Sequence, residues 1–296
     1  MIILKKYTKL AIFSIIFIIV SPIVVLYAKG DIFTDGWNIL KTGGIYVTNA
    51  PVGSEIFINS KLKDSISFFQ RSVLVKSLRP GNYEIFVKKK GYNSWTNEIK
   101  VYANIVSEVN VFMLPTELEL KEITKYNLTE DATGSVVSTQ VKNKEYEDIR
   151  LFFSKNSGEV AKQDLPTSAI NLKSNLGTKE SPIIKGKLRL WQENGEIFVA
   201  WFGKHDTAPK YFCRESDCTQ TVSMFNFGKQ LRRINFLPEY DDVIIVALDN
   251  KIEAFQMDSY LKKVFQDIYV GKNPDFLIID GTLYVKDGDF IAKVVF

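Results

Sequence analysis

A run of nineteen residues without a charged side chain divides this chain into two very unequal parts. The run extends from Leu10 to Ala28, between Lys9 and Lys29. A helix rises about 1.5 Å per residue, so this run spans roughly 28 Å, close to the ~30 Å hydrocarbon core of a bilayer. We therefore expect a transmembrane helix over residues 10–28, kinked at Pro22.

The charges beside this run predict its orientation. Lysines precede it at positions 5, 6 and 9, whereas Asp31 and Asp35 follow Lys29. Because positive charge favours the cytoplasmic side, residues 1–9 are expected to be a cytoplasmic tail and the rest to lie outside a single-pass anchor in the cell membrane. The alternative is a cleaved signal peptide, although Leu26 would then occupy the −3 position before Ala28, where a small residue is preferred.

The net charge of +4 comes entirely from this N-terminal region. Residues 1–30 hold four lysines and no acid, so the remaining 34 basic and 34 acidic side chains cancel. Nucleic-acid binding needs a sustained basic face, and we therefore expect none. The two cysteines are too few for a disulfide-built scaffold.

Beyond a linker at residues 29–43, apolar and polar residues alternate with a period of two. Tyr83, Ile85 and Val87 form one such series, and Val109, Val111 and Met113 form another. This period is typical of half-buried strands, and turn residues separate the series. We expect a β-sandwich over residues 44–115.

The turns of this region carry a family resemblance. A Pro51-Val52-Gly53-Ser54 turn precedes an alternating strand, a Pro80-Gly81 turn precedes a strand with Tyr83, and a Gly91-Tyr92 pair follows. In order and spacing residues 44–115 resemble the PEGA domain. The resemblance implies a small antiparallel β-sandwich, usually non-catalytic and common in prokaryotic envelope proteins. Ser54 departs from the usual alanine, and Lys63–Arg71 replaces a short Gly/Thr/Pro stretch.

These motif residues have structural interpretations of their own. Proline presets φ for a turn, as at Pro51 and Pro80, and glycine at 53, 81 and 91 can take a positive φ. The rings of Tyr83 and Tyr92 are expected in the core, with hydroxyls that tie down loops.

Residues 116–296 are expected to form an all-β domain. Strand pairs flank Asn194-Gly195, Asp249-Asn250 and Asp280-Gly281, and a further strand follows Asp287-Gly288. Such turns are strong hairpin signals, and repeated meanders are typical of propeller blades. We expect about four blades, with residues 117–123 pairing against the C-terminus. A second β-sandwich or an open sheet stack is the alternative.

No catalytic or metal-binding set stands out. The single histidine, His205, is interpreted as an exposed turn residue, and the chain has no Gly-x-Ser-x-Gly motif. Asp241-Asp242 and Asp287–Asp289 lack the regular oxygen spacing of a calcium loop and read as hairpin turns. We expect no cofactor, no metal and no enzyme activity.

Three features are candidates for contacts or cross-links. Cys213 and Cys218 are predicted to form a disulfide across a short hairpin, as an oxidising exterior allows. The run Lys88-Lys89-Lys90 could contact anionic lipid or wall polymer, or be a solvated turn. Phe68 and Phe69 cannot both enter one core from an extended strand, so at least one is a candidate anchor for the distal domain, another protein or a sugar, unless a bulge buries both.

Together these features predict a membrane-anchored, extracytoplasmic, non-catalytic scaffold or binding module of the cell envelope that contacts glycan or protein. An extracytoplasmic hydrolase of wall or surface polysaccharide and a sensor co-subunit are the alternatives.

Overall fold

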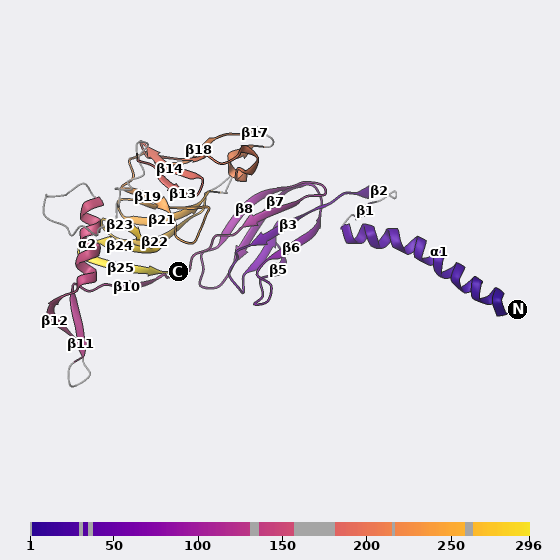
Figure 1. Cartoon of the computed structure of the whole chain (residues 1–296), viewed down its shortest axis with the longest axis horizontal. Coiled ribbons are helices and arrows are strands. Elements are labelled where there is room, and N and C mark those ends of the chain that lie inside the picture. The colour runs from indigo at the N-terminus through magenta and orange to yellow at the C-terminus, as the bar shows by residue number, and fades with distance from the viewer. Residues whose placement is uncertain are drawn as a thin grey trace. The chain divides into compact units, whose positions relative to one another are not determined.

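The computed structural model describes all residues except 1, 30–31, 35–37, 131–135, 157–180, 215–216 and 258–262. The chain divides into two compact units (Figure 1). The first unit comprises Met1–Lys90 and Ser94–Met113, and the second comprises Gly91–Asn93 and Leu114–Phe296. The protein is mainly β, as predicted, and its sheets are described here unit by unit.

Helix α1 extends from Ile2 to Lys29 with Pro22 inside it, so the predicted helix is confirmed and is longer than the uncharged run. Over the part of the chain that the structure describes, no helix combines the length and the apolar character that a membrane crossing requires. The membrane span therefore stays a prediction from the sequence. A two-stranded sheet of β1 (Ile32–Thr34) and β2 (Asn38–Leu40) follows the helix.

Two sheets make up the rest of the first unit. One has the order β6-β3-β9 and the other β5-β4-β7-β8. The bounds are β3 Gly43–Thr48, β4 Glu55–Ile58, β5 Lys61–Ser65, β6 Val73–Leu78, β7 Gly81–Lys88, β8 Trp95–Val101 and β9 Val106–Asn110. The sandwich prediction was wrong in one respect, because β3 and β9 pair in parallel rather than antiparallel. Strand β3 is the first and β9 the last strand of the two sheets. A period-two pattern predicts a strand but does not predict whether it pairs in parallel or antiparallel.

The core of this unit comes from alternate residues of both sheets. Ile45 and Val47 on β3, together with Ile56 on β4 and Ile85 and Val87 on β7, have no exposed surface. Most of their neighbours along each strand are less buried, and the alternation in the sequence identified Ile85 and Val87 correctly.

The second unit contains three four-stranded antiparallel sheets among its described residues, where about four blades were expected. Their orders are β13-β14-β15-β18, β19-β20-β21-β22 and β10-β25-β24-β23. The predicted hairpins at Asn194-Gly195, Asp249-Asn250 and Asp280-Gly281 are all present. The bounds are β10 Glu119–Glu122, β13 Ile183–Lys185, β14 Leu188–Glu193, β15 Glu196–Trp201, β18 Thr221–Asn226, β19 Arg233–Phe236, β20 Val243–Ala247, β21 Lys251–Gln256, β22 Phe265–Val270, β23 Asp275–Ile279, β24 Thr282–Asp287 and β25 Phe290–Val295.

The expectation of an all-β C-terminal region was wrong, because the second unit also contains helix α2, Lys144–Asn156. Asn143 caps it: the Asn143 side-chain oxygen accepts the backbone N–H of Glu145 at 3.0 Å. Tyr146, Ile149 and Phe153 form its buried stripe. The helix is just over three turns long and its buried stripe has only three residues, so the helical pattern is weak in the sequence. A hairpin of β11 (Tyr126–Glu130) and β12 (Val136–Lys142) precedes it.

A buried ion pair joins two of the three sheets. Arg233 on β19 donates to both carboxylate oxygens of Asp275 on β23, at 2.9 Å and 3.0 Å. The Arg233 side chain is 3% exposed and the Asp275 side chain 14%. This two-point geometry fixes an edge strand of one sheet, β19, against an edge strand of another, β23.

Candidate binding surfaces

The predicted disulfide between Cys213 and Cys218 is confirmed. It joins directly opposed residues of a two-stranded hairpin, β16 (Cys213–Arg214) and β17 (Asp217–Cys218). The sequence predicted this pairing because the only two cysteines flank a short charged insert that is typical of a hairpin loop.

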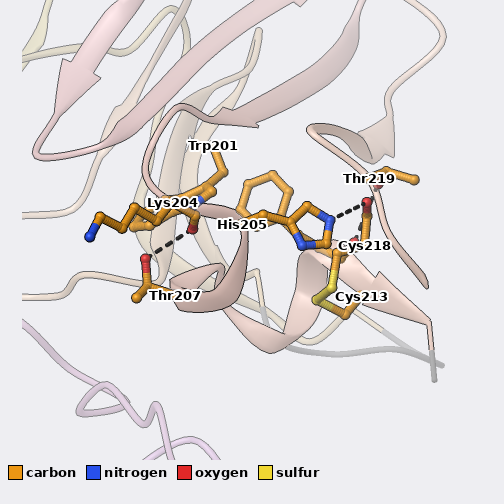
Figure 2. Close-up of a disulfide and its surroundings, with 8 residues drawn as sticks. Trp201, Lys204, His205, Thr207, Cys213, Cys218 and Thr219 are labelled. Carbon is orange, nitrogen blue, oxygen red and sulfur yellow. Dashed lines mark hydrogen bonds between the residues drawn. A yellow bond between two sulfur atoms is a disulfide. The ribbon is translucent and has the colours of Figure 1, made fainter. Parts of the chain in front are cut away.

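His205 lies beside this hairpin, and it is exposed in a turn as predicted (Figure 2). Its Nε2 donates to the carbonyl oxygen of Cys218 at 3.3 Å. The same turn is held from the other side, since the indole N–H of Trp201 and the hydroxyl of Thr207 both donate to the carbonyl of Lys204. His205 therefore makes a hydrogen bond that stabilises the turn beside the hairpin. The sequence did not predict this contact.

A groove of about 550 Å³ runs between this hairpin and the outermost strand of its neighbouring sheet. Its apolar lining comes from Phe212, Met224 and Met257, each at most 6% exposed. Asp217 and Thr219 of the hairpin region supply polar groups. The sequence did not indicate this groove, because its residues come from separate parts of the chain and no local pattern joins them.

Phe68 and Phe69 are both exposed, at 77% and 96%. Strand β5 ends at Ser65, and the chain then turns, with Gln70 N–H donating to Ser67 O. The two rings meet edge to face with centroids 5.4 Å apart. Because the segment is a turn and not a strand, the rings do not point to opposite faces, and neither enters the core. Ile66 alone is buried from this loop, at 2% exposure.

The lysine run is partly engaged inside its own domain. Lys88 forms an ion pair with Glu55 at 3.2 Å and lies 4.9 Å from the centroid of the Phe57 ring. Lys89 is half-buried and Lys90 is exposed. Lys88 therefore has structural partners inside the domain, and a contact with lipid or wall polymer through this run stays a prediction.

The turn motifs take the geometry that their residues predicted. Gly53 and Gly91 have φ of 88° and 77°. Ser54, which replaces the usual alanine, is completely buried, and its hydroxyl donates to the carbonyl of Pro51 at 2.6 Å. That bond satisfies the buried hydroxyl, so the departure costs little.

The tyrosines of these motifs are half-buried rather than in the core, so that part of the expectation was wrong. The Tyr83 hydroxyl donates to the carbonyl of Arg79 at 2.9 Å, which ties down the loop at Pro80-Gly81 as predicted. Tyr92 forms a β-bridge with Pro115. A polar tip that must reach a backbone carbonyl or solvent keeps such rings near the surface.

The acidic turns have structural partners. Asp287 accepts the backbone N–H groups of Lys272 and Asn273 at 2.8 Å and 3.1 Å. Asp242 accepts from the Gln256 amide at 2.6 Å. Among the residues that the structure describes, no group of three or more His, Cys, Asp or Glu side chains could hold a metal ion.

Comparison with known proteins identifies one part of the chain. Residues 42–117 match the PEGA domain family, two residues beyond the predicted domain at each end. No curated protein matches the chain significantly by sequence.

Proposed function

From the PEGA domain at residues 42–117 we propose that this chain is a membrane-anchored, non-catalytic binding module of the cell envelope, which contacts a protein or glycan through the aromatic pair Phe68–Phe69. The observation that carries the proposal is the exposure of both rings, at 77% and 96%. Adjacent exposed aromatics are costly in water and are the usual anchors of protein contacts and of sugar stacking.

The character of α1 supports the anchor. Over residues 11–25 its large apolar side chains are between 45% and 70% exposed and lie on every side of the helix. A helix that is apolar all round suits a lipid environment better than water, where one face would be polar. The lysines before the run favour an N-terminus in the cytoplasm, with the chain after the helix outside.

The anchor is tested by fractionation of cells that produce the full chain. The protein should sediment with membranes and resist alkaline carbonate, and protease added outside should digest everything after Lys29. A soluble mature form that begins near Lys29 would instead identify a cleaved signal peptide.

The contact is tested by site-specific photo-crosslinking in intact cells. A photoreactive phenylalanine analogue at Phe69 should form a discrete adduct with an envelope protein or glycan. Tyr102, which is 43% exposed in the same domain, is the matched control position. Equal labelling at the two positions would contradict a contact through the aromatic pair.

We also propose that the three sheets of the second unit are blades of a propeller-like domain. A cavity of about 590 Å³ is lined by residues of β13, β19 and β23, each of which is an edge strand of one of the three sheets. In a propeller the innermost edge strand of each blade lines the central channel, and this shared cavity supports that arrangement. An experimental structure of the chain with these three strands apart would rule it out.

A further inference from the structure

Among the edge strands of the described sheets of three or four strands, β18 alone carries no charged residue. The five described sheets of three or four strands have ten edge strands, and β18 has the sequence Thr-Val-Ser-Met-Phe-Asn. Each of the other nine carries at least one charged residue: Lys61 on β5, Lys100 on β8, Lys76 on β6, Glu108 on β9, Lys121 on β10, Asp275 on β23, Lys185 on β13, Arg233 on β19 and Asp267 on β22. Charged residues and prolines are the devices that keep an edge from pairing with another chain, and β18 has neither.

The register shows which backbone groups of β18 face outward. The N–H of Trp201 donates to the carbonyl of Gln220, which makes that pair a hydrogen-bonded one. The next pair, Ala200 with Thr221, is therefore of the non-hydrogen-bonded type. The N–H and C=O groups of Thr221, and by the same alternation those of Ser223, point away from β15 toward the open edge. The register shift that follows, between Ile197 and Phe198, ends this regular stretch.

The groove of about 550 Å³ lies along this same edge. Four consecutive residues of β18, Thr221–Met224, line it. Consecutive strand residues point to opposite faces, so a space that touches all four runs along the backbone edge of the strand rather than across one face. Apolar side chains of Phe212 and Met257 lie in the same groove, where alternate side chains of an added strand would pack.

The far side of the groove is held in place by the disulfide. Asp217 and Thr219 belong to the hairpin region closed by Cys213–Cys218, and Thr219 donates through its N–H and its hydroxyl to the carbonyl of Phe212. A preorganised groove lowers the entropy cost of ordering a bound chain.

We propose that the outer edge of β18 binds an extended segment of another protein by strand addition. The segment pairs through the outward N–H and C=O groups of Thr221 and Ser223, and its alternate apolar side chains enter the groove. This site belongs to the second unit and does not depend on the proposed contact through Phe68 and Phe69.

The test uses the full chain in detergent and a phage-displayed library of random twelve-residue peptides. Selection against the wild-type chain should enrich peptides with alternating apolar residues. Ser223→Pro removes one outward N–H without breaking the ladder to β15 and should weaken binding of the enriched peptides at least tenfold. The matched control, Ser223→Val, keeps that N–H and should bind as the wild type does.

N-methylation of the selected peptide tests the pairing even where the proline variant fails to fold. Methyl groups on one set of alternate amides should abolish binding, whereas methyl groups on the other set should leave it unchanged. Equal effects of the two sets, or no enrichment over the Ser223→Pro chain, would overturn the proposal. Retention of soluble peptidoglycan strands by the groove, with no peptide bound, would show a glycan site instead.

Discussion

Leu120, at the start of the second unit, lies directly opposite Val294, near the end of the chain. Strand β10 thereby becomes the outermost strand of a sheet whose other three strands are the last three of the sequence. The predicted pairing of residues 117–123 with the C-terminus is confirmed. Such a joint ties the two ends of a unit together, so that neither end can fray alone.

The first prediction concerns this joint. The N–H of Ile123 donates to the carbonyl of Ile291, and by alternation the N–H of Lys121 also faces β25. Lys121→Pro should lower the free energy of unfolding of the second unit by about 1–3 kcal/mol, since it leaves a ladder carbonyl without its donor. The N–H of Glu122 faces away from β25, so Glu122→Pro should lower the free energy of unfolding clearly less. Equal costs in urea denaturation would show that the ladder bond is not the cause.

The second prediction concerns the disulfide. In the chain-entropy model, closing so short a loop stabilises the fold by about 2 kcal/mol at most. The double substitution of Cys213 and Cys218 by serine should lower the stability of the second unit by no more than that. The double substitution should also weaken the binding of peptides to the β18 groove. Alkylation without reductant followed by intact mass should add no label to the wild-type chain, and two adducts would mean free thiols.

The sequence predicted elements wherever a local signal decides the structure. Period-two alternation located the strands that contain Ile85 and Val87, and Asn194-Gly195 located a hairpin, because burial and turn geometry are properties of a few neighbouring residues. The buried stripe of helix α2 has only three residues, whereas strand direction and the ion pair of Arg233 with Asp275 depend on residues far apart in the chain. The β18 groove was beyond prediction for the same reason, since Phe212, Met224 and Met257 meet only in the folded unit.

The third prediction concerns helix α2 and pH. Burial raises the pKa of Tyr146 above its ordinary value of 10.0, helped by the charge of Asp289. Its hydroxyl donates to the carbonyl of Asp289 at 2.8 Å. Because the unfolded chain loses this proton first, the stability that Tyr146 contributes is present below pH 10 and is lost as the pH rises further.

Tyr146→Phe separates this effect from other alkaline changes. The variant should be less stable than the wild type by about 1 kcal/mol at neutral pH, from the lost hydrogen bond. The difference should shrink above about pH 10, where the wild type begins to lose the contribution. Burial raises the pKa of Tyr284 in the same way, and Tyr284 is present in both proteins. Parallel stability curves up to strongly alkaline pH would contradict the role assigned to Tyr146.

The fourth prediction concerns the buried ion pair. Asp275→Ala leaves the guanidinium of Arg233 buried without its carboxylate and should cost about 3–5 kcal/mol of stability. Replacing both residues by apolar ones of similar volume, Met at 233 and Leu at 275, should recover most of this loss. Urea denaturation of the wild type and the two variants decides the matter, and a double variant as unstable as Asp275→Ala would point to a packing defect instead.

The fifth prediction concerns the aromatic pair and the residue beside it. Phe68→Ala and Phe69→Ala remove side chains that are 77% and 96% exposed, so each should change the stability of the PEGA domain by less than about 0.5 kcal/mol. Ile66→Ala, from the same loop, empties a buried position and should cost about 2–4 kcal/mol. Denaturation of the full chain compares the three directly. Since the aromatic variants keep the fold, their effect on photo-crosslinking from a neighbouring position such as Gln70 reports on the contact alone. Large stability losses in both phenylalanine variants would place these rings in a core and remove the basis for the proposed contact.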